Sequence, residues 1–158
     1  MNRSENEEYI IGCVSLLSNK ITQFGDSILP DITFKQWFLL IMISKMELSE
    51  KSINSIAEVV GTTRQNVKKM LVPLENKGYV RIEKSNNDAR ALKVELTEKA
   101  YQYFTENDAS TVRETNRLFS TFSTEEIDGL ACTLKKLLCS FEKYRKELQD
   151  YEQCKTDI

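Results

Sequence analysis

Residues 52–80 read SINSIAEVVGTTRQNVKKMLVPLENKGYV and contain two short amphipathic helical patterns separated by a glycine. Gly61 is the residue type that most readily adopts a left-handed turn, and Thr63 can cap the helix that follows. The first helix would bury three apolar side chains: Ile56, Ala57 and Val60. Because the small Ala57 permits two helices to cross closely, the stretch predicts a helix-turn-helix.

The second helix of this stretch has two chemically different faces. Its inner face would consist of Val67, Met70, Leu71 and Leu74. Its outer face would carry Arg64, Gln65, Lys68 and Lys69. A basic outer face suits a recognition helix that enters the major groove, although an ordinary helical hairpin with a solvated basic face has the same pattern.

A β-hairpin is predicted directly after the second helix. Residues 79–84 and 92–96 alternate between apolar and polar side chains, and the turn between them, SNNDARA, is polar. A helix-turn-helix followed by a hairpin with Arg90 near its tip is a winged helix, in which one element enters the major groove and the other reaches phosphate or the minor groove. The pattern therefore favours binding to double-stranded DNA.

Long apolar stripes lie on both sides of this unit. The helix expected over residues 6–29, which Pro30 ends, has the stripe Ile10, Val14, Leu17, Ile21, Phe24 and Ile28. The last helix, opened by a Ser123–Glu126 capping box, has the stripe Ile127, Leu130, Leu134, Leu137, Phe141, Tyr144, Leu148 and Tyr151. Packing within one chain would explain both stripes, but we favour a shared homodimer interface because both lie outside the winged helix.

These patterns predict a mainly α fold with a small β-hairpin wing. Residues 33–97 would form the winged helix-turn-helix DNA-binding domain, opened by a Thr33–Gln36 capping box and a largely buried helix. Residues 1–32 and 98–158 would form a helical dimerisation region.

Composition argues against an enzyme. The chain has no histidine, which removes the commonest general base and metal ligand, and its five glycines form no phosphate-binding loop. Its four cysteines are scattered without a CxxC pair, so free thiols are expected rather than disulfides or a metal site. We expect no catalytic residues, no metal and no cofactor.

Charge is distributed unevenly along the chain. Residues 51–96 carry nine basic and five acidic side chains, a net charge of +4, whereas the whole chain has −2. A basic module in an acidic chain is typical of a protein of which one part meets phosphate. The chain shows neither a secretory signal nor a long apolar segment, so a soluble cytoplasmic protein with no membrane partner is expected.

Three segments resemble the multiple-antibiotic-resistance regulator (MarR) family of bacterial transcription factors. They are IAEVVGTTRQNVKKMLVPLENKGYVRI (56–82), the wing motif DARA (88–91) and LTEKA (96–100). The resemblance implies that Asp88 and Arg90 stabilise and tip the wing. It also implies that the recognition helix begins with Thr63, Arg64, Gln65 and Asn66 and continues with Lys68 and Lys69; together these eight residues are the DNA-contact candidates.

Two neighbouring residues depart from the family pattern. Val72 and Pro73 stand where polar or charged residues are usual, and a proline inside a helix removes a backbone hydrogen bond and can bend the helix. The spacing of the two recognition helices in a dimer, and hence the geometry of the DNA half-sites, depends on this point.

The resemblance implies a repressor that binds a pseudo-palindromic operator as a homodimer and is released by a small, often aromatic, effector. The side chains that could contact such an effector are Phe24, Phe34, Trp37 and Phe38, for which a plain core role is the alternative. Two further readings are a winged-helix protein-interaction module without DNA binding, and a thiol-based redox sensor that acts through Cys13. In the peroxide-sensing branch of the family, tyrosines surround a reactive cysteine of the first helix. This chain has no tyrosine between Tyr9 and Tyr79, so we favour an inert thiol at Cys13.

Overall fold

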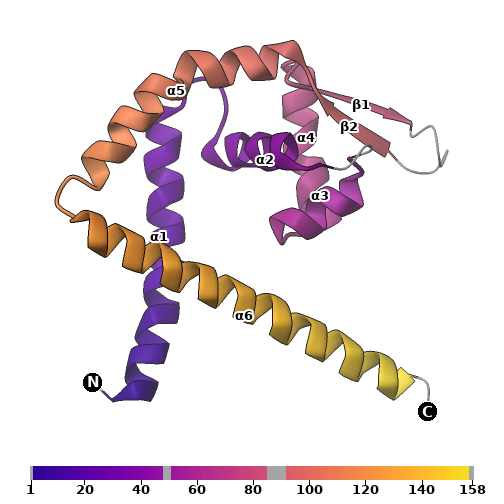
Figure 1. Cartoon of the computed structure of the whole chain (residues 1–158). Helices are drawn as coiled ribbons and strands as arrows, with labels where there is room; N and C mark the ends of the chain where they lie inside the picture. Colours follow the sequence, from indigo (N-terminus) through magenta and orange to yellow (C-terminus); the bar gives the residue numbers. More distant parts are fainter. Residues whose placement is uncertain (1, 48–50, 85–91, 157–158) are drawn as a thin grey trace. The chain divides into compact units, whose positions relative to one another are not determined.

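The computed structural model describes residues 2–47, 51–84 and 92–156, with side chains described as far as residue 148. The elements follow in the order α1 (Arg3–Ile28), α2 (Phe34–Lys45), α3 (Ile53–Val60), α4 (Arg64–Asn76), β1 (Val80–Lys84), β2 (Leu92–Leu96), α5 (Glu98–Leu118) and α6 (Thr124–Thr156) (Figure 1). The chain divides into two compact units, residues 1–114 and 115–158. The predicted fold class, mainly helical with a hairpin wing, is confirmed.

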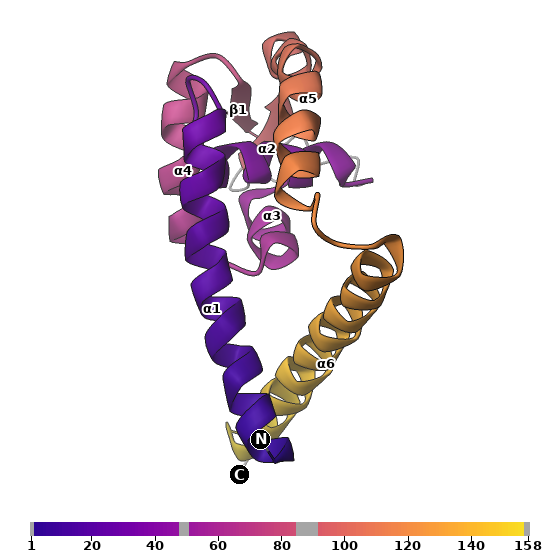
Figure 2. The ribbon, with the colours of Figure 1, turned by 90° about the vertical axis from the view of Figure 1, so that its left-hand side faces the viewer.

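Helix α1 is one uninterrupted helix (Figure 2). It begins at a capping box between Asn2 and Glu5 and ends just before Pro30, as predicted. Among the described residues of the first unit, nothing covers the middle of its apolar stripe, where Val14 is 40% exposed and Leu17 55% exposed.

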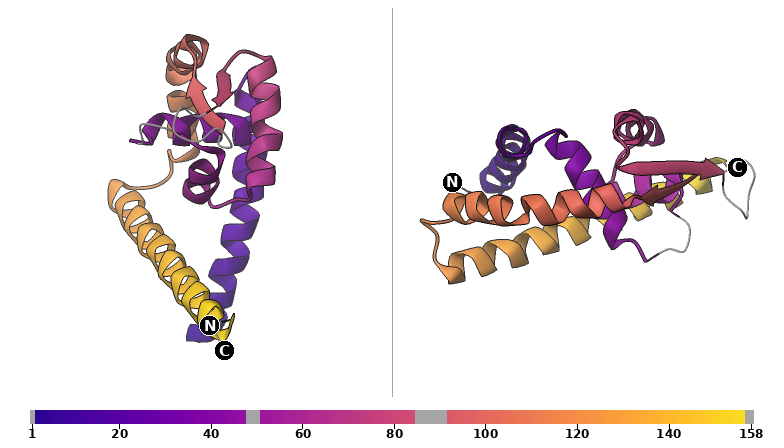
Figure 3. Two further views of the ribbon diagram at one scale, coloured as in Figure 1. Left: turned by 90° about the vertical axis from the view of Figure 1, so that its right-hand side faces the viewer. Right: turned by 90° about the horizontal axis from the view of Figure 1, so that it is seen from above.

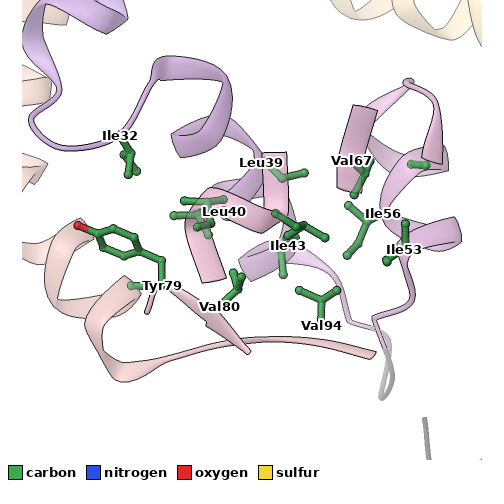
Figure 4. Packing of buried hydrophobic residues seen from close by; sticks show 14 of the residues in the cluster. Ile32, Leu39, Leu40, Ile43, Ile53, Ile56, Val67, Tyr79, Val80 and Val94 are labelled. Carbon is green, nitrogen blue, oxygen red and sulfur yellow. The ribbon is translucent and has the colours of Figure 1, made fainter. Parts of the chain in front are cut away.

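Helix α2 lies at the centre of the first unit. The predicted capping box of Thr33 and Gln36 is present, and Leu39, Leu40 and Ile43 are fully buried. These side chains converge with those of α3, α4 and the hairpin in one core (Figure 4). The buried helix expected from the dense apolar run is therefore confirmed, and it supports the elements that follow.

Helices α1 and α2 meet at a glycine. Gly25 is buried, and a Cβ atom placed on it would lie 2.5 Å from Cγ of Phe34, well inside van der Waals contact. Beside this contact the backbone N–H of Phe34 donates a hydrogen bond of 2.7 Å to Oδ1 of Asp26. The close approach and the hydrogen bond fix the end of α1 against the start of α2.

The predicted hairpin is confirmed by the antiparallel strands β1 and β2 (Figure 3). Val80 pairs with Leu96 and Lys84 with Leu92, which places Val80 and Val94 in the core. The hairpin is also attached to the chain before α3, because the N–H of Val94 donates to the carbonyl of Lys51 at 2.8 Å. The wing tip, residues 85–91, lies outside the described residues.

The second unit consists of the end of α5 and the long helix α6. The Ser123–Glu126 capping box predicted at the start of α6 is present, with both reciprocal hydrogen bonds. Within this unit the apolar stripe of α6 remains exposed, at 41% for Leu134 and 52% for Phe141. Among the helices that the structure describes, none is long and apolar enough to cross a membrane.

The contact between α1 and α2 yields a stability prediction. Gly25→Ala should lower the free energy of unfolding by about 1–3 kcal/mol, because the new methyl group overlaps the ring of Phe34. Gly12→Ala is the control on the same helix: nothing lies within 4 Å of its added Cβ, so the helix should gain up to about 1 kcal/mol. Urea unfolding of the two variants measures both effects, and equal stability of the two would contradict the prediction.

Candidate nucleic-acid interface

The turn between α3 and α4 has the predicted geometry. Gly61 adopts a φ of 70°, and its N–H donates back to the carbonyls of Ala57 and Glu58. Thr63 then caps α4, since its Oγ1 accepts a hydrogen bond of 3.2 Å from the N–H of Asn66. The left-handed turn favours a residue without a side chain at position 61, so glycine sets the angle at which α4 leaves the turn.

Helix α4 is held by one face and open on the other. Val67, Leu71 and Leu74 are fully buried, as the apolar periodicity predicted. On the opposite side Gln65, together with the neighbouring lysines, is exposed. Because 3.6 residues make one turn, burial of the first set forces the second set outward.

The basic side chains of this outward face have no ion-pair partner among the residues that the structure describes. Arg64, Lys68 and Lys69 are exposed, and in the described part of the chain no carboxylate lies within ion-pair distance of any of them. Unpaired cations on a fixed helix face attract phosphate, since no local carboxylate has to be displaced.

Three other basic residues of the +4 segment are neutralised within the first unit. Lys77 pairs with Asp31 at 3.1 Å, and Arg81 pairs with Glu83 at 3.2 Å. Lys93 pairs with Glu95, and its hydrogen bond lowers the pKa of that carboxyl. Summed charge along the sequence could not separate these three cations from the unpaired ones on α4.

The remaining DNA-contact candidates lie in three different situations. Thr63 is occupied as the cap of α4, although its hydroxyl can still donate. The side-chain amide of Asn66 donates to the hydroxyl of Thr62 at 3.2 Å, so it is turned toward the helix start. Asp88 and Arg90 lie outside the described residues.

Pro73 does not interrupt the recognition helix. Helix α4 continues through it to Asn76, and the N–H of Lys77 donates to the carbonyl of Pro73 at 3.1 Å. The proline lies in the last turns of the helix, beyond all the candidate base-contacting residues. Its neighbour Val72 is 54% exposed.

A polar junction that the sequence did not reveal joins the end of α4 to the loop before α2. Asp31 has a φ of 67°, which aspartate tolerates better than most residues. Its carboxylate accepts a hydrogen bond of 2.6 Å from the hydroxyl of Tyr79, while Nζ of Lys77 donates to its carbonyl and its carboxylate. The bonds from Tyr79 and Lys77 lower the pKa of Asp31.

Helix α5 is tied into the same junction. The ring of Tyr103 lies edge-on to that of Tyr79, with centroids 5.4 Å apart, and its hydroxyl donates to the carbonyl of Pro30 at 2.6 Å. Burial raises the pKa of Tyr103 to about 12. Lys99 donates to the carbonyl of Lys77 at 2.7 Å. The ends of α1 and α4 and the start of α5 are therefore held together.

Three of the four expected effector residues form a partly exposed aromatic cluster on α2. The ring centroids of Phe34 and Trp37 are 5.6 Å apart, and those of Phe34 and Phe38 are 6.5 Å apart. Phe38 is 41% exposed, whereas Trp37 packs against the core. Phe24 is half-buried on α1. Trp37 therefore has a core role, whereas the ring of Phe38 is accessible from solvent.

The helix-turn-helix, the hairpin and this open helix face together form a winged helix. The chain matches the family model described as the winged helix DNA-binding domain over residues 32–100. It is 27% identical to the transcriptional repressor MprA of Escherichia coli strain K12 over 108 residues, which make up 68% of this chain and 61% of that protein. The chain thus spans less than two thirds of the length of this relative.

Solved structures share the fold over most of the chain. The S. aureus MepR–DNA complex is 24% identical, with a TM-score of 0.72, and the match covers 82% of this chain and 95% of that one. A mutant MarR from E. coli, complexed with operator DNA, is 20% identical, with a TM-score of 0.75 and coverage of 87% and 99%. The chain is therefore similar to winged-helix transcriptional regulators of the MarR family. These matches confirm the resemblance found in the sequence and agree with the prediction of a transcriptional regulator.

The junction makes stability depend on pH in a specific direction. Because the pKa of Asp31 is lowered in the folded chain, its contribution is present above the ordinary value of 3.8 and is lost as the pH falls through the lowered pKa. Asp31→Asn keeps the tolerance for positive φ but removes the charge. The difference in unfolding free energy between wild type and this variant should therefore be larger at about pH 6 than at about pH 3.

Urea unfolding at the two pH values measures this difference. Asp128→Asn, a change of an exposed aspartate on α6, provides the control for a general effect of removing one carboxylate. A gap for Asp31→Asn that stays constant or widens toward low pH would contradict the assigned bonds.

Proposed function

We propose that this protein is a soluble cytoplasmic repressor that binds a pseudo-palindromic DNA operator as a homodimer and is released by a small-molecule effector. Residues 33–97 act as the DNA-binding domain, and residues 1–32 and 98–158 as the dimerisation region. The relative named a transcriptional repressor supports the direction of regulation. Two solved structures of similar fold contain DNA, and they support DNA as the ligand of this protein.

One observation carries the proposal: the outward face of α4 presents Arg64, Lys68 and Lys69, which have no ion-pair partner in the described part of the chain, beside the exposed Gln65. Cations neutralise phosphates and an amide can read a base edge in the major groove. A winged helix that binds only another protein does not require unpaired positive charge on this face. The rival interaction-module reading is therefore disfavoured.

Apolar exposure supports the dimer. The stripes of α1 and α6 leave side chains such as Leu17, Phe141 and Tyr144 open, the last at 61%. Rows of large apolar side chains of this length are seldom left to solvent in a monomer. A second copy of the chain is the occupant proposed for each stripe.

The aromatic edge of α2 is the proposed effector contact, with Phe38 as its accessible ring. A flat apolar effector could stack on it. Redox sensing by Cys13 remains the weaker alternative: this half-buried residue lies beside Tyr9, and the thiol raises the pKa of that tyrosine.

DNA binding should separate into affinity and specificity. Gln65→Ala should relax the sequence preference, since a lost bidentate base contact is worth about 1–3 kcal/mol. Lys69→Ala and Arg90→Ala should weaken binding to all sequences, and each lost phosphate contact should lower the slope of log K against log salt by about 0.9. Selection from random duplexes should enrich inverted repeats with half-sites about 10 base pairs apart.

Fluorescence anisotropy across a salt series measures these effects, with Lys136→Ala on α6 as the matched control outside the interface. The DNA-binding proposal fails if no inverted repeat is enriched in the absence of effector. It also fails if the Lys69 and Arg90 variants bind DNA as tightly as the control.

Dimerisation is tested on α6. Leu137→Glu combined with Phe141→Glu should give monomers or insoluble chains, because the carboxylates would enter an apolar interface without partners. Lys136→Glu, outside the apolar stripe of the same helix, should leave the dimer intact. Light scattering gives the mass, and a folded monomer of the unaltered protein would refute the interface.

A further inference from the structure

Helix α4 exposes one large aliphatic side chain, and it stands on the DNA-facing side. Val72 is 54% exposed, whereas Leu71 before it and Leu74 after it are fully buried. These two anchors fix the rotation of the helix at this turn, so Val72 cannot move into the core. An apolar side chain that points into solvent contributes favourable free energy only when a binding partner removes its surface from water.

Val72 continues the row of residues proposed to read DNA. It follows Lys69 by three residues and Gln65 by seven, and both spacings place side chains on one face of a helix. Seven residues advance the helix by about 10 Å, and base pairs are about 3.4 Å apart. Because a recognition helix follows the major groove rather than the DNA axis, a side chain at residue 72 would lie about two to three base pairs beyond the base edge that Gln65 faces.

We propose that Val72 contacts the C5 methyl group of a thymine and so specifies a T·A pair at this distance in each half-site. The inference deepens the proposed function and rests on it. In the major groove the thymine methyl is the apolar group that distinguishes this base pair from the others, and aliphatic or methyl-bearing side chains recognise it by contact. The departure of Val72 from the polar family pattern thereby becomes a specificity feature rather than a defect.

Valine is well suited to this contact. Its branched Cβ leaves one strongly preferred χ1 rotamer in a helix, so few conformations are lost on binding. Its neighbours in the row, Gln65 and Lys69, end in a polar and a charged group and have no methyl group to offer. Val72 is the residue of this face that can discriminate a methyl group.

The experiment removes the methyl group from the DNA. In an operator obtained by selection, each thymine of the half-site is replaced in turn by deoxyuridine, which keeps the base pair and loses only the methyl. Wild-type protein should bind one substituted position about fourfold more weakly per half-site, the effect of one buried methyl-sized group. Val72→Ala should bind the unsubstituted operator with this lower affinity and should show no further loss at that position.

Val59→Ala provides the matched control, because Val59 is an exposed valine, at 45%, on the neighbouring helix α3. This variant should keep the wild-type response to deoxyuridine. If every deoxyuridine position affects wild type and Val72→Ala equally, Val72 does not read thymine and the inference is overturned while the DNA-binding proposal stands. If wild type binds no duplex at all, the proposed function itself falls.

Discussion

Burial of one face of α4 is the constraint on which the rest of the structure depends. Val67, Leu71 and Leu74 are all fully buried against a core shared with α2, α3 and the hairpin. A helix anchored along successive turns cannot rotate, so every other side chain on it has a determined direction. The same packing that stabilises this unit therefore places Gln65 and Lys69 in solvent. The side chains that α4 does not bury are the ones available to a binding partner.

A second set of contacts connects this helix to the elements around it. The Asp31 junction joins the loop after α1, the end of α4 and the start of α5, and the Gly25–Phe34 contact holds α1 against α2. The aromatic cluster on α2 lies directly beside that contact. Within residues 1–114, a ligand that displaces the ring of Phe34 would therefore change the packing between α1 and α2. Asp31, in the loop between these two helices, is hydrogen-bonded to Lys77 and Tyr79 after α4, so such a change could reach α4.

The basic residues of the first unit fall into two groups, those in ion pairs with carboxylates and those without such a partner among the described residues. Lys77, Arg81 and Lys93 are matched with carboxylates and contribute to local structure, whereas Lys68 and Lys69 are left unmatched on α4 among the residues that the structure describes. A chain with a net charge of −2 can present positive charge to DNA in this way, since the field near a surface depends on local pairing more than on the total.

The sequence by itself determined the elements and their faces, because helix periodicity, the Gly61 turn and the Thr33, Thr63 and Ser123 caps are local signals. It therefore predicted the winged helix and the outward side of α4. Tertiary structure alone decided that Lys77 is neutralised and that Asp31 is the centre of a junction. The partners of Asp31 lie 46 and 48 residues away, and no local pattern encodes such a pairing. Contacts between distant segments depend on how the elements pack, and packing is a property of the folded chain.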